Sequence, residues 1–196
     1  MVSTVYLVRH GRTALNVAGV LRGRIDEPLD SAGRAEARRL GSLFVPVPLT
    51  GVISSPLKRS FETARMIAEP HGLAVTADPD FIDRDYGPWA GQPGQALAAR
   101  YGSVDAAPAD EVEPRAAFER RVATALERVA READGGSVAV VAHDAVNRAL
   151  IRLVGGRPRA DTDAPQPTGC WNRFVFDGGG GTCEVVGAVP GDGIIP

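Results

Sequence analysis

The stretch TVYLVRHG at residues 4–11 combines a β-strand pattern with an abrupt change to polar residues. Its first five residues are mostly β-branched, aromatic or aliphatic, which predicts a strand that ends where the Arg-His-Gly sequence begins. Two later stretches end in a similar way, GVISSP at residues 51–56 and VAVVAH at residues 138–143. The last of these is too continuously apolar for an edge strand, so we expect it inside a parallel sheet.

Helices are expected between these strands, because apolar residues recur there at helical spacing. The expected helices cover residues 31–43, 56–69, 95–101, 115–132 and 144–154, and further strands cover residues 73–77, 171–176 and 182–188. In the second helix, Ser55 is the expected N-cap and Pro56 the first helical residue. The alternation of strands and helices predicts one domain, residues 1–196, with a three-layer α/β/α sandwich and a largely parallel central sheet.

The composition excludes several classes of protein. The 196 residues are 44% hydrophobic and 23% charged, with a net charge of −2, which is typical of a globular domain. No basic arm or acidic tail is present, which argues against binding to nucleic acid or to a membrane surface. No apolar stretch approaches the ~18 residues of a membrane span, and the first residues do not form a signal peptide. We therefore expect a soluble, cytoplasmic protein.

Side chains suited to binding phosphate follow three of the expected strands. Arg9 and His10 follow the first, Arg59 lies shortly after the second, and His143 follows the third. Because ligands of open α/β sheets bind at the carboxyl ends of the strands, we expect these side chains to share one crevice. An imidazole nitrogen can attack phosphorus, and guanidinium groups neutralise phosphoryl oxygens through charge-assisted hydrogen bonds. The pattern therefore predicts a phosphoryl-transfer site.

Sequence motifs for metals and nucleotide cofactors are missing. Neither H-x-H nor H-E-x-x-H occurs, and the glycine-rich motifs that bind nucleotides are absent. Cys170 and Cys183 fit neither a disulfide framework nor a zinc site, and we expect them to be buried or incidental thiols. We therefore expect no metal and no cofactor.

Four stretches match, in order, the motifs of one enzyme family. LVRHGRTALN at residues 7–16 resembles its R-H-G-x-T-x-x-N signature, and DEPLDSAG at residues 26–33 resembles its D-x-P-L-T-x-x-G stretch. SSPLKRSFETA at residues 54–64 resembles its S-S-P-L-x-R-x-x-x-T-A segment, and VVAH at residues 140–143 resembles its second-histidine strand. The family is the histidine phosphatase superfamily, also called phosphoglycerate mutase-like, and the resemblance is to its phosphatase branch.

The resemblance implies a role for several residues. His10 would be the nucleophile, and Arg9, Arg59 and His143 would bind the phosphate with help from Asn16. The family needs neither a metal nor an organic cofactor for hydrolysis, and its fold agrees with the expected sandwich. These features imply a histidine acid phosphatase-type hydrolase that acts on a small-molecule phosphate monoester. The terminal hairpin formed by the last two strands could pair in a homodimer.

The proton donor departs from the family pattern. The family's L-x-E-x-D-x-G-x-W-E-G stretch corresponds here to FIDRDYGPWAG at residues 81–91, so Asp83 replaces the usual glutamate. Asp83 is the expected general acid, and Asp85 is the competing candidate. Both lie in residues 78–114, a long irregular stretch rich in proline and glycine, which we expect to form a lid or insertion over the site.

Three further departures concern charge near the site. Arg12 and Arg22 stand where the family usually has glutamate and glutamine, which fits either surface drift in an arginine-rich chain or a substrate with a second anionic group. Asp144 replaces a common glycine after the second histidine. Its carboxylate would repel phosphate unless it is turned away or paired, for example with Arg148.

Three functions remain open at this point. The leading one is a phosphomonoesterase that works through phosphohistidine at His10. A phosphoglycerate mutase-type phosphoryl transfer is the second, although the chain is short for that branch and has QPGQ at residues 92–95 in place of its E-R-H-Y-G segment. The third is a non-catalytic module that binds a phosphorylated ligand.

Overall fold

The computed structural model describes residues 1–154, 164–178, 180–194 and 196. Within these residues, six strands form one sheet in the order β3-β2-β4-β1-β5-β6. The strands are β1 Ser3–Arg9, β2 Leu49–Ser54, β3 Val75–Ala77, β4 Ser137–Ala142, β5 Trp171–Phe176 and β6 Gly181–Ala188. The first four strands of that order pair in parallel, whereas β5 and β6 are antiparallel additions. The expected largely parallel sheet is confirmed, with β4 in its interior.

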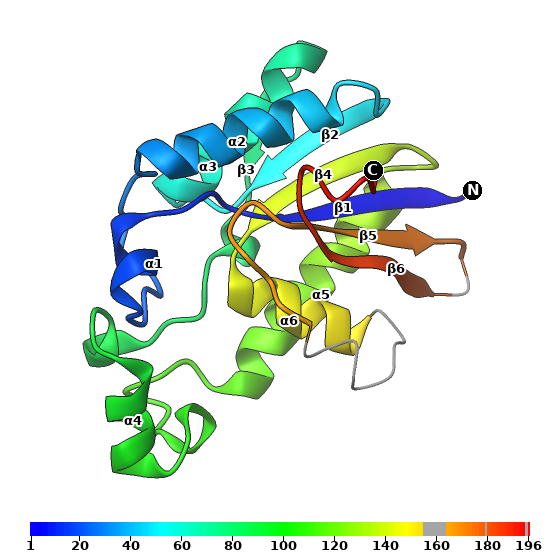
Figure 1. Ribbon diagram of the computed structural model, residues 1–196. Helices are drawn as coiled ribbons and strands as arrows, with labels where there is room; N and C mark the ends of the chain where they lie inside the picture. The colour runs from blue at the N-terminus through cyan, green and yellow to red at the C-terminus, as the bar shows by residue number, and fades with distance from the viewer. Residues whose placement is uncertain (155–163, 179, 195) are drawn as a thin grey trace.

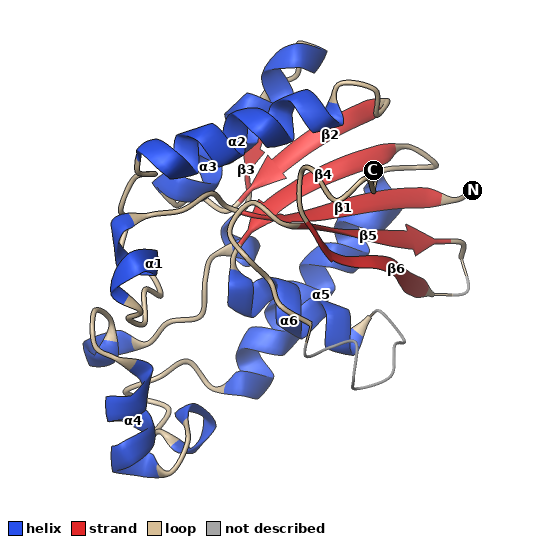
Figure 2. Ribbon diagram, in the orientation of Figure 1, coloured by secondary structure: helices blue, strands red, loops and turns tan. Residues whose placement is uncertain are grey.

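Helices cover both faces of the sheet, as Figure 2 shows. The helices α2 Ser31–Phe44 and α3 Lys58–Ala68 lie on one face, and α5 Arg115–Glu132 and α6 Asp144–Leu153 lie on the other. Alternate residues of β1 face opposite sides, as the pleat of a strand requires. Val5 and Leu7 pack in the core with α5 and α6, whereas Tyr6 and Val8 pack with α2 and α3. The α/β/α layering predicted from the sequence is therefore confirmed.

The beginning of α3 differs from the prediction. The helix begins at Lys58. Its N-cap residue is Leu57, whose side chain cannot accept a hydrogen bond from the first turn. The expected cap, Ser55, is fully buried, and its hydroxyl lies 2.8 Å from Nε2 of His143. The Ser55 side chain thus pairs with the histidine that follows β4, while the helix begins three residues later. Arg59 still lies in the first turn, as expected.

The stretch between β3 and α5 contains short helical turns and one longer helix, α4 Gly94–Tyr101. Figure 1 shows this stretch and the short helix α1 Ala14–Ala18 beyond the carboxyl end of β1. Oε2 of Glu111 accepts hydrogen bonds from Nε1 of Trp89 at 2.8 Å and from the Tyr101 hydroxyl at 2.9 Å. These contacts fold the stretch onto itself beside the end of the sheet.

Two other expectations can be compared with the structure. Cys170 and Cys183 are buried thiols that are not joined as a disulfide, as predicted. None of the helices in the described part of the chain has both the length and the apolar character needed to cross a bilayer. The turn of the terminal hairpin expected from the last two strands includes residue 179, which lies outside the described residues.

Candidate active site

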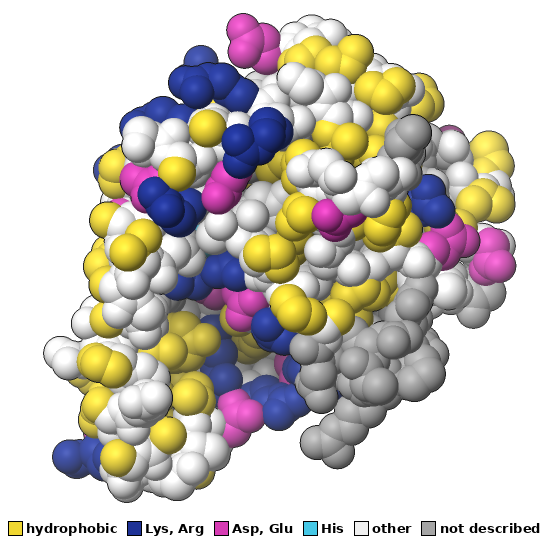
Figure 3. All heavy atoms as spheres, in the orientation of Figure 1, with side chains coloured by type: hydrophobic (Ala, Val, Ile, Leu, Met, Phe, Trp, Pro, Cys, Tyr) yellow, Lys and Arg dark blue, Asp and Glu magenta, His cyan; other side chains and the backbone are white. Residues whose placement is uncertain are grey.

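The ends of β1, β2 and β4 bring the predicted site residues together. The backbone N–H of His10 donates to the Ala142 carbonyl at 3.1 Å, and that of Ser55 donates to the Val141 carbonyl at 3.0 Å. The rings of His10 and His143 lie with their centroids 5.3 Å apart. Three segments that are distant in sequence therefore meet at one edge of the sheet, as the sequence predicted. Figure 3 shows the surface hollowed between this edge and the α4 stretch, with basic and acidic side chains lining the hollow.

The His10 ring is held as a neutral imidazole. Its Nδ1 lies 2.7 Å from the Gly11 carbonyl, so Nδ1 carries the hydrogen and Nε2 keeps its lone pair. Nε of Arg59 lies 3.2 Å from that Nε2 atom. Burial, followed by the charges of Arg59 and Arg9, holds the pKa of His10 well below its ordinary value. The ring is thus a neutral base with its free nitrogen turned toward a cation.

Arg59 is the cation at the centre of the site. Its side chain is fully buried, and its Nη1 donates to the Ile25 carbonyl at 2.6 Å and its Nη2 to the Gly23 carbonyl at 2.9 Å. Gly23 adopts a φ of 50°, and a Cβ there would lie 3.0 Å from the Tyr86 ring, so glycine suits this close passage. The backbone of residues 23–25 therefore wraps around the guanidinium and fixes its orientation.

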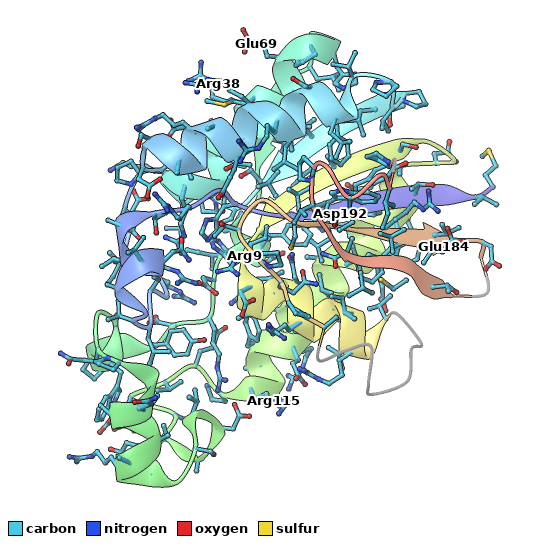
Figure 4. The ribbon with its side chains drawn as sticks, viewed as in Figure 1. Arg9, Arg38, Glu69, Arg115, Glu184 and Asp192 are labelled. Carbon is cyan, nitrogen blue, oxygen red and sulfur yellow. The ribbon has the colours of Figure 1, made fainter. Side chains whose placement is uncertain are left out.

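Arg9 ends β1 and is labelled in Figure 4. Its Nη1 donates to the backbone carbonyl of Gln166 and lies 3.5 Å from Oδ1 of Asp144. The Asp144 carboxylate also pairs with Nε of Arg148 at 3.1 Å, so of the two alternatives that the sequence left open for Asp144 the structure shows the paired one. Nε of Arg9 is buried without a hydrogen-bond partner among the described residues.

His143 presents one ring nitrogen to the protein and the other to the site. Nε2 lies 2.8 Å from the Ser55 hydroxyl, whereas Nδ1 is buried and has no hydrogen-bond partner in the described part of the chain. Burial is the main cause that holds the pKa of His143 well below its ordinary value. Buried polar atoms without a hydrogen-bond partner are rare in native proteins, and each calls for an explanation. An anion bound between Arg9 and His143 would supply the missing acceptors.

Asp83 is the carboxylate that lies close to both Arg59 and His143. Its Oδ2 lies 3.5 Å from Nη2 of Arg59 and 3.9 Å from Nδ1 of His143. The side chain is buried, and this burial raises the pKa of Asp83 although Arg59 acts to lower it. Asp85 is directed elsewhere, since it pairs with Arg24 at 3.2 Å and its side chain is 39% exposed. Of the two candidate acids, only Asp83 contacts the residues of the site.

Asn16 has a different local role from the other predicted residues. Its Oδ1 accepts hydrogen bonds from the backbone N–H and the hydroxyl of Thr13, each at 2.9 Å, and this capping box begins α1. Within the described ranges, Asn16 makes no hydrogen bond to Arg9, His10, Arg59 or His143. Its amide Nδ2 remains without a partner there.

Three residues in or beside the site make contacts that the sequence did not predict. Ser55 orients His143, Gln166 holds Arg9 through its backbone carbonyl, and Thr63 accepts a hydrogen bond from the Gly11 N–H at 3.1 Å. Ser55 and Thr63 both lie within the motif at residues 54–64, whose letters could have drawn attention to them. Nothing in the sequence around Gln166 marks it, because its contact is made by the backbone.

A resident metal ion would need a cluster of suitable side chains. Among the residues that the structure describes, no group of three or more histidine, cysteine, aspartate or glutamate side chains could hold one. Independence of metals stays a prediction for an assay.

The motifs, the fold and the site geometry agree with one family. The family model described as histidine phosphatase superfamily (branch 1) matches residues 5–188, and the chain belongs to this family. Its relatives include the "Uncharacterized phosphatase PhoE" of Bacillus subtilis, 32% identical over 154 residues, which cover 79% of this chain and 78% of the relative. The adenosylcobalamin/alpha-ribazole phosphatase of Salmonella typhimurium is 28% identical over 93% of this chain and 95% of its own length.

A solved structure confirms the fold. The crystal structure of a phosphoglycerate mutase from Bacillus anthracis superposes with a TM-score of 0.86 at 25% identity, covering 95% of this chain and 93% of that one. The chain thus shares the phosphoglycerate mutase-like fold, and its relatives include proteins named as phosphatases.

Proposed function

We propose that this protein is a phosphomonoesterase that hydrolyses a small phosphorylated metabolite through a covalent phosphohistidine on His10. One observation carries the proposal: the neutral His10 ring directs Nε2 into a site where Nε of Arg9 and Nδ1 of His143 are buried without hydrogen-bond partners among the described residues. A tetrahedral phosphoryl group offers several acceptor oxygens at once and would satisfy these donors. In the classification of such enzymes this is a histidine acid phosphatase-type hydrolase.

In the first step, the lone pair on Nε2 of His10 attacks phosphorus while the ester P–O bond breaks. Asp83, protonated at the start, gives its proton to the departing alkoxide oxygen. Guanidinium groups of Arg9 and Arg59 and the Nδ1–H of His143 bind the phosphoryl oxygens as negative charge develops there. We also propose that Nδ2 of Asn16 donates to this group, since that nitrogen has no partner among the described residues.

In the second step, water attacks the phosphorus of the phosphohistidine and the P–N bond breaks. The Asp83 carboxylate accepts a proton from the attacking water, and His10 returns to its neutral form. The positive charge of Arg59 stabilises both the Asp83 carboxylate and the bound phosphoryl group. A bound dianion therefore competes for that charge and raises the pKa of Asp83 further, which favours the protonated acid. Residues 78–114, which carry Asp83, act in this proposal as the lid.

The test is to trap the intermediate. Wild-type protein quenched during turnover of a ³²P-labelled phosphate monoester, in buffer with EDTA, should carry an acid-labile, base-stable label. His10→Ala should lose the label and at least about 10⁴-fold in kcat, while keeping its melting temperature within a few degrees. Label on a serine, wild-type turnover in the variant, or loss of activity in EDTA with rescue by Mg²⁺ would overturn the mechanism. A strict need for a bisphosphorylated primer would instead favour a mutase.

A further inference from the structure

Arg22 lies in a loop whose position is fixed by its backbone. The adjacent Leu21 donates its N–H to the Gln92 carbonyl at 2.9 Å and accepts the Gly91 N–H at 2.7 Å. On the other side, the Gly23 carbonyl accepts from Nη2 of Arg59 at 2.9 Å. Arg22 is therefore held between the stretch that carries Asp83 and the central guanidinium of the site.

The guanidinium of Arg22 has no partner of its own among the described residues. Its Nε is buried without a hydrogen-bond acceptor, and no ion pair joins Arg22 to a carboxylate within residues 1–154, 164–178, 180–194 and 196. By contrast, Arg9 pairs with Asp144 and Arg59 lies 3.5 Å from Asp83. The side chain is only half-buried, whereas that of Arg59 is fully buried, so Arg22 lies nearer to the mouth of the site.

The charge of Arg22 also reaches the reacting groups. It contributes to lowering the pKa of His10 and His143, and it opposes the rise in the pKa of Asp83. Three arginines thus surround the site, and Arg22 is the one of the three without a carboxylate partner among the described residues. The third positive charge is available for another part of the ligand.

Arg12, another arginine that the sequence singled out, provides a natural contrast. Its Nε donates to Oδ2 of Asp30 at 2.9 Å, next to the N-terminus of α2, and its side chain is 42% exposed. Arg12 is therefore already neutralised outside the site, whereas Arg22 has no such carboxylate in the described part of the chain. The two arginines have the same chemistry but different access to a ligand.

We propose that Arg22 is a specificity-determining residue that binds a second anionic group of the substrate, a carboxylate or a second phosphate near the ester. The inference rests on the proposed function, and it narrows the substrate class to small phosphate monoesters with two anionic groups. A guanidinium forks onto either group with paired hydrogen bonds, so the shared chemistry is the bidentate anion. Phosphate monoesters whose alcohol part carries no second anionic group, such as simple sugar phosphates, would be poorer ligands.

The test measures binding without turnover. In the His10→Ala background, calorimetry compares phosphoglycolate with phosphoglycolamide, and ethylene glycol bisphosphate with 2-hydroxyethyl phosphate. In at least one pair, we expect the ligand with two anionic groups to bind about 10- to 100-fold more tightly than the ligand with one. The pair that shows this preference identifies the second group as a carboxylate or a phosphate. Adding Arg22→Gln should abolish this preference. The affinity for the ligand whose phosphate is its only anionic group should stay within about threefold of that of His10→Ala alone. Arg22→Lys should retain part of the preference, and Arg12→Gln should retain all of it.

Several outcomes would overturn the assignment. The first is that His10→Ala shows no preference in either pair, or binds none of the four ligands. The second is that Arg22→Gln weakens the affinity for both ligands of a pair equally. The third is that Arg12→Gln also loses the preference. Failure of the proposed function would be recognised separately, because the wild-type protein would then fail to turn over p-nitrophenyl phosphate or would do so without His10.

Discussion

The two sides of the site are held in place by different kinds of contact. On the side of the sheet, His10 and Ser55 are fixed by backbone hydrogen bonds to the carbonyls of Ala142 and Val141. These bonds continue the ladder of a parallel sheet, so the residues cannot move without breaking it. His143 follows directly at the end of β4, and its position is fixed by the same strand.

On the opposite side, Asp83 is held by side chains from elsewhere in the chain. Nη1 of Arg121, from α5, donates to the Asp80 carbonyl at 2.7 Å and to the Ile82 carbonyl at 3.0 Å. Arg121 in turn pairs with Glu113 at 2.9 Å. The nucleophile therefore lies on the edge of the sheet, whereas the acid lies on a segment held by these side-chain contacts, by the buried Phe81 and by backbone hydrogen bonds at Asp78 and Asp85. The acid side is the one that can adjust to a substrate, because such contacts break without loss of the sheet.

Arg59 touches both sides, so changing it should impair the nucleophile and the acid together, with every substrate. Arg59→Lys keeps a charge but loses the fork that contacts His10, Asp83 and the carbonyls at residues 23 and 25. We expect kcat/KM for p-nitrophenyl phosphate to fall about 10²- to 10³-fold, as for loss of a donor to the transition state. Arg34→Lys, which alters an ion pair with Glu62 at 2.6 Å outside the site, is the matched control. A loss below tenfold in a folded Arg59→Lys protein would mean that the fork does not bind the phosphoryl group.

Asp83→Asn tests the acid side of the site alone, because it removes the proton donor and keeps the nucleophile. A general acid contributes about 10²- to 10⁴-fold when the leaving group is a poor one, and little when it leaves readily as an anion. Hydrolysis of an alkyl phosphate should therefore slow by that factor, while hydrolysis of p-nitrophenyl phosphate changes less than about tenfold. Since burial raises the pKa of Asp83, the wild-type rate on alkyl phosphates should fall as pH rises through that pKa. This alkaline limb should be absent from the variant.

Asp85→Asn is the control for this experiment, because Asp85 pairs with Arg24 and is directed away from the site. It should slow both substrates equally and by less than about threefold. If the dependence on the leaving group followed Asp85, or neither aspartate, the assignment of Asp83 would be wrong while the His10 nucleophile would stand.

The rigid side of the site is also the side that the sequence predicted best. Strands and regular helices follow from residue periodicity, and the helix expected over residues 115–132 has these same bounds in α5. The end of a strand fixes where the next residue lies. The sequence alone was therefore enough to place His10 and His143 at one edge of the sheet. The antiparallel pairing of β5 to β1 and the late start of α3 depended on contacts that are distant in the sequence.

The loop residues of the site could be predicted less well. Arg22 and Arg12 look alike in the sequence, and only the folded chain shows that one pairs with Asp30 and the other has no described partner. The contact of Gln166 with Arg9 uses a backbone carbonyl, which every residue possesses. Asn16 matches the family motif, yet its side-chain oxygen bonds Thr13 in a capping box. Such roles depend on tertiary placement, which residue type alone does not determine.

The smallest expected effect concerns stability on the rigid side. The pKa of His143 is held well below its ordinary value in the folded state, so the unfolded chain binds more protons between that lowered pKa and about 6.5. Stability therefore falls as the pH drops below about 6.5, and His143 contributes to this fall. His143→Gln cannot bind that proton and can keep the hydrogen bond to Ser55. The drop in melting temperature between pH 7 and pH 5 should be smaller in the variant by about 2–4 °C, the shift that ~1 kcal/mol produces in a domain of this size. An equal drop in melting temperature between pH 7 and pH 5 in the wild type and in His143→Gln would show that the effect does not arise from burial of His143.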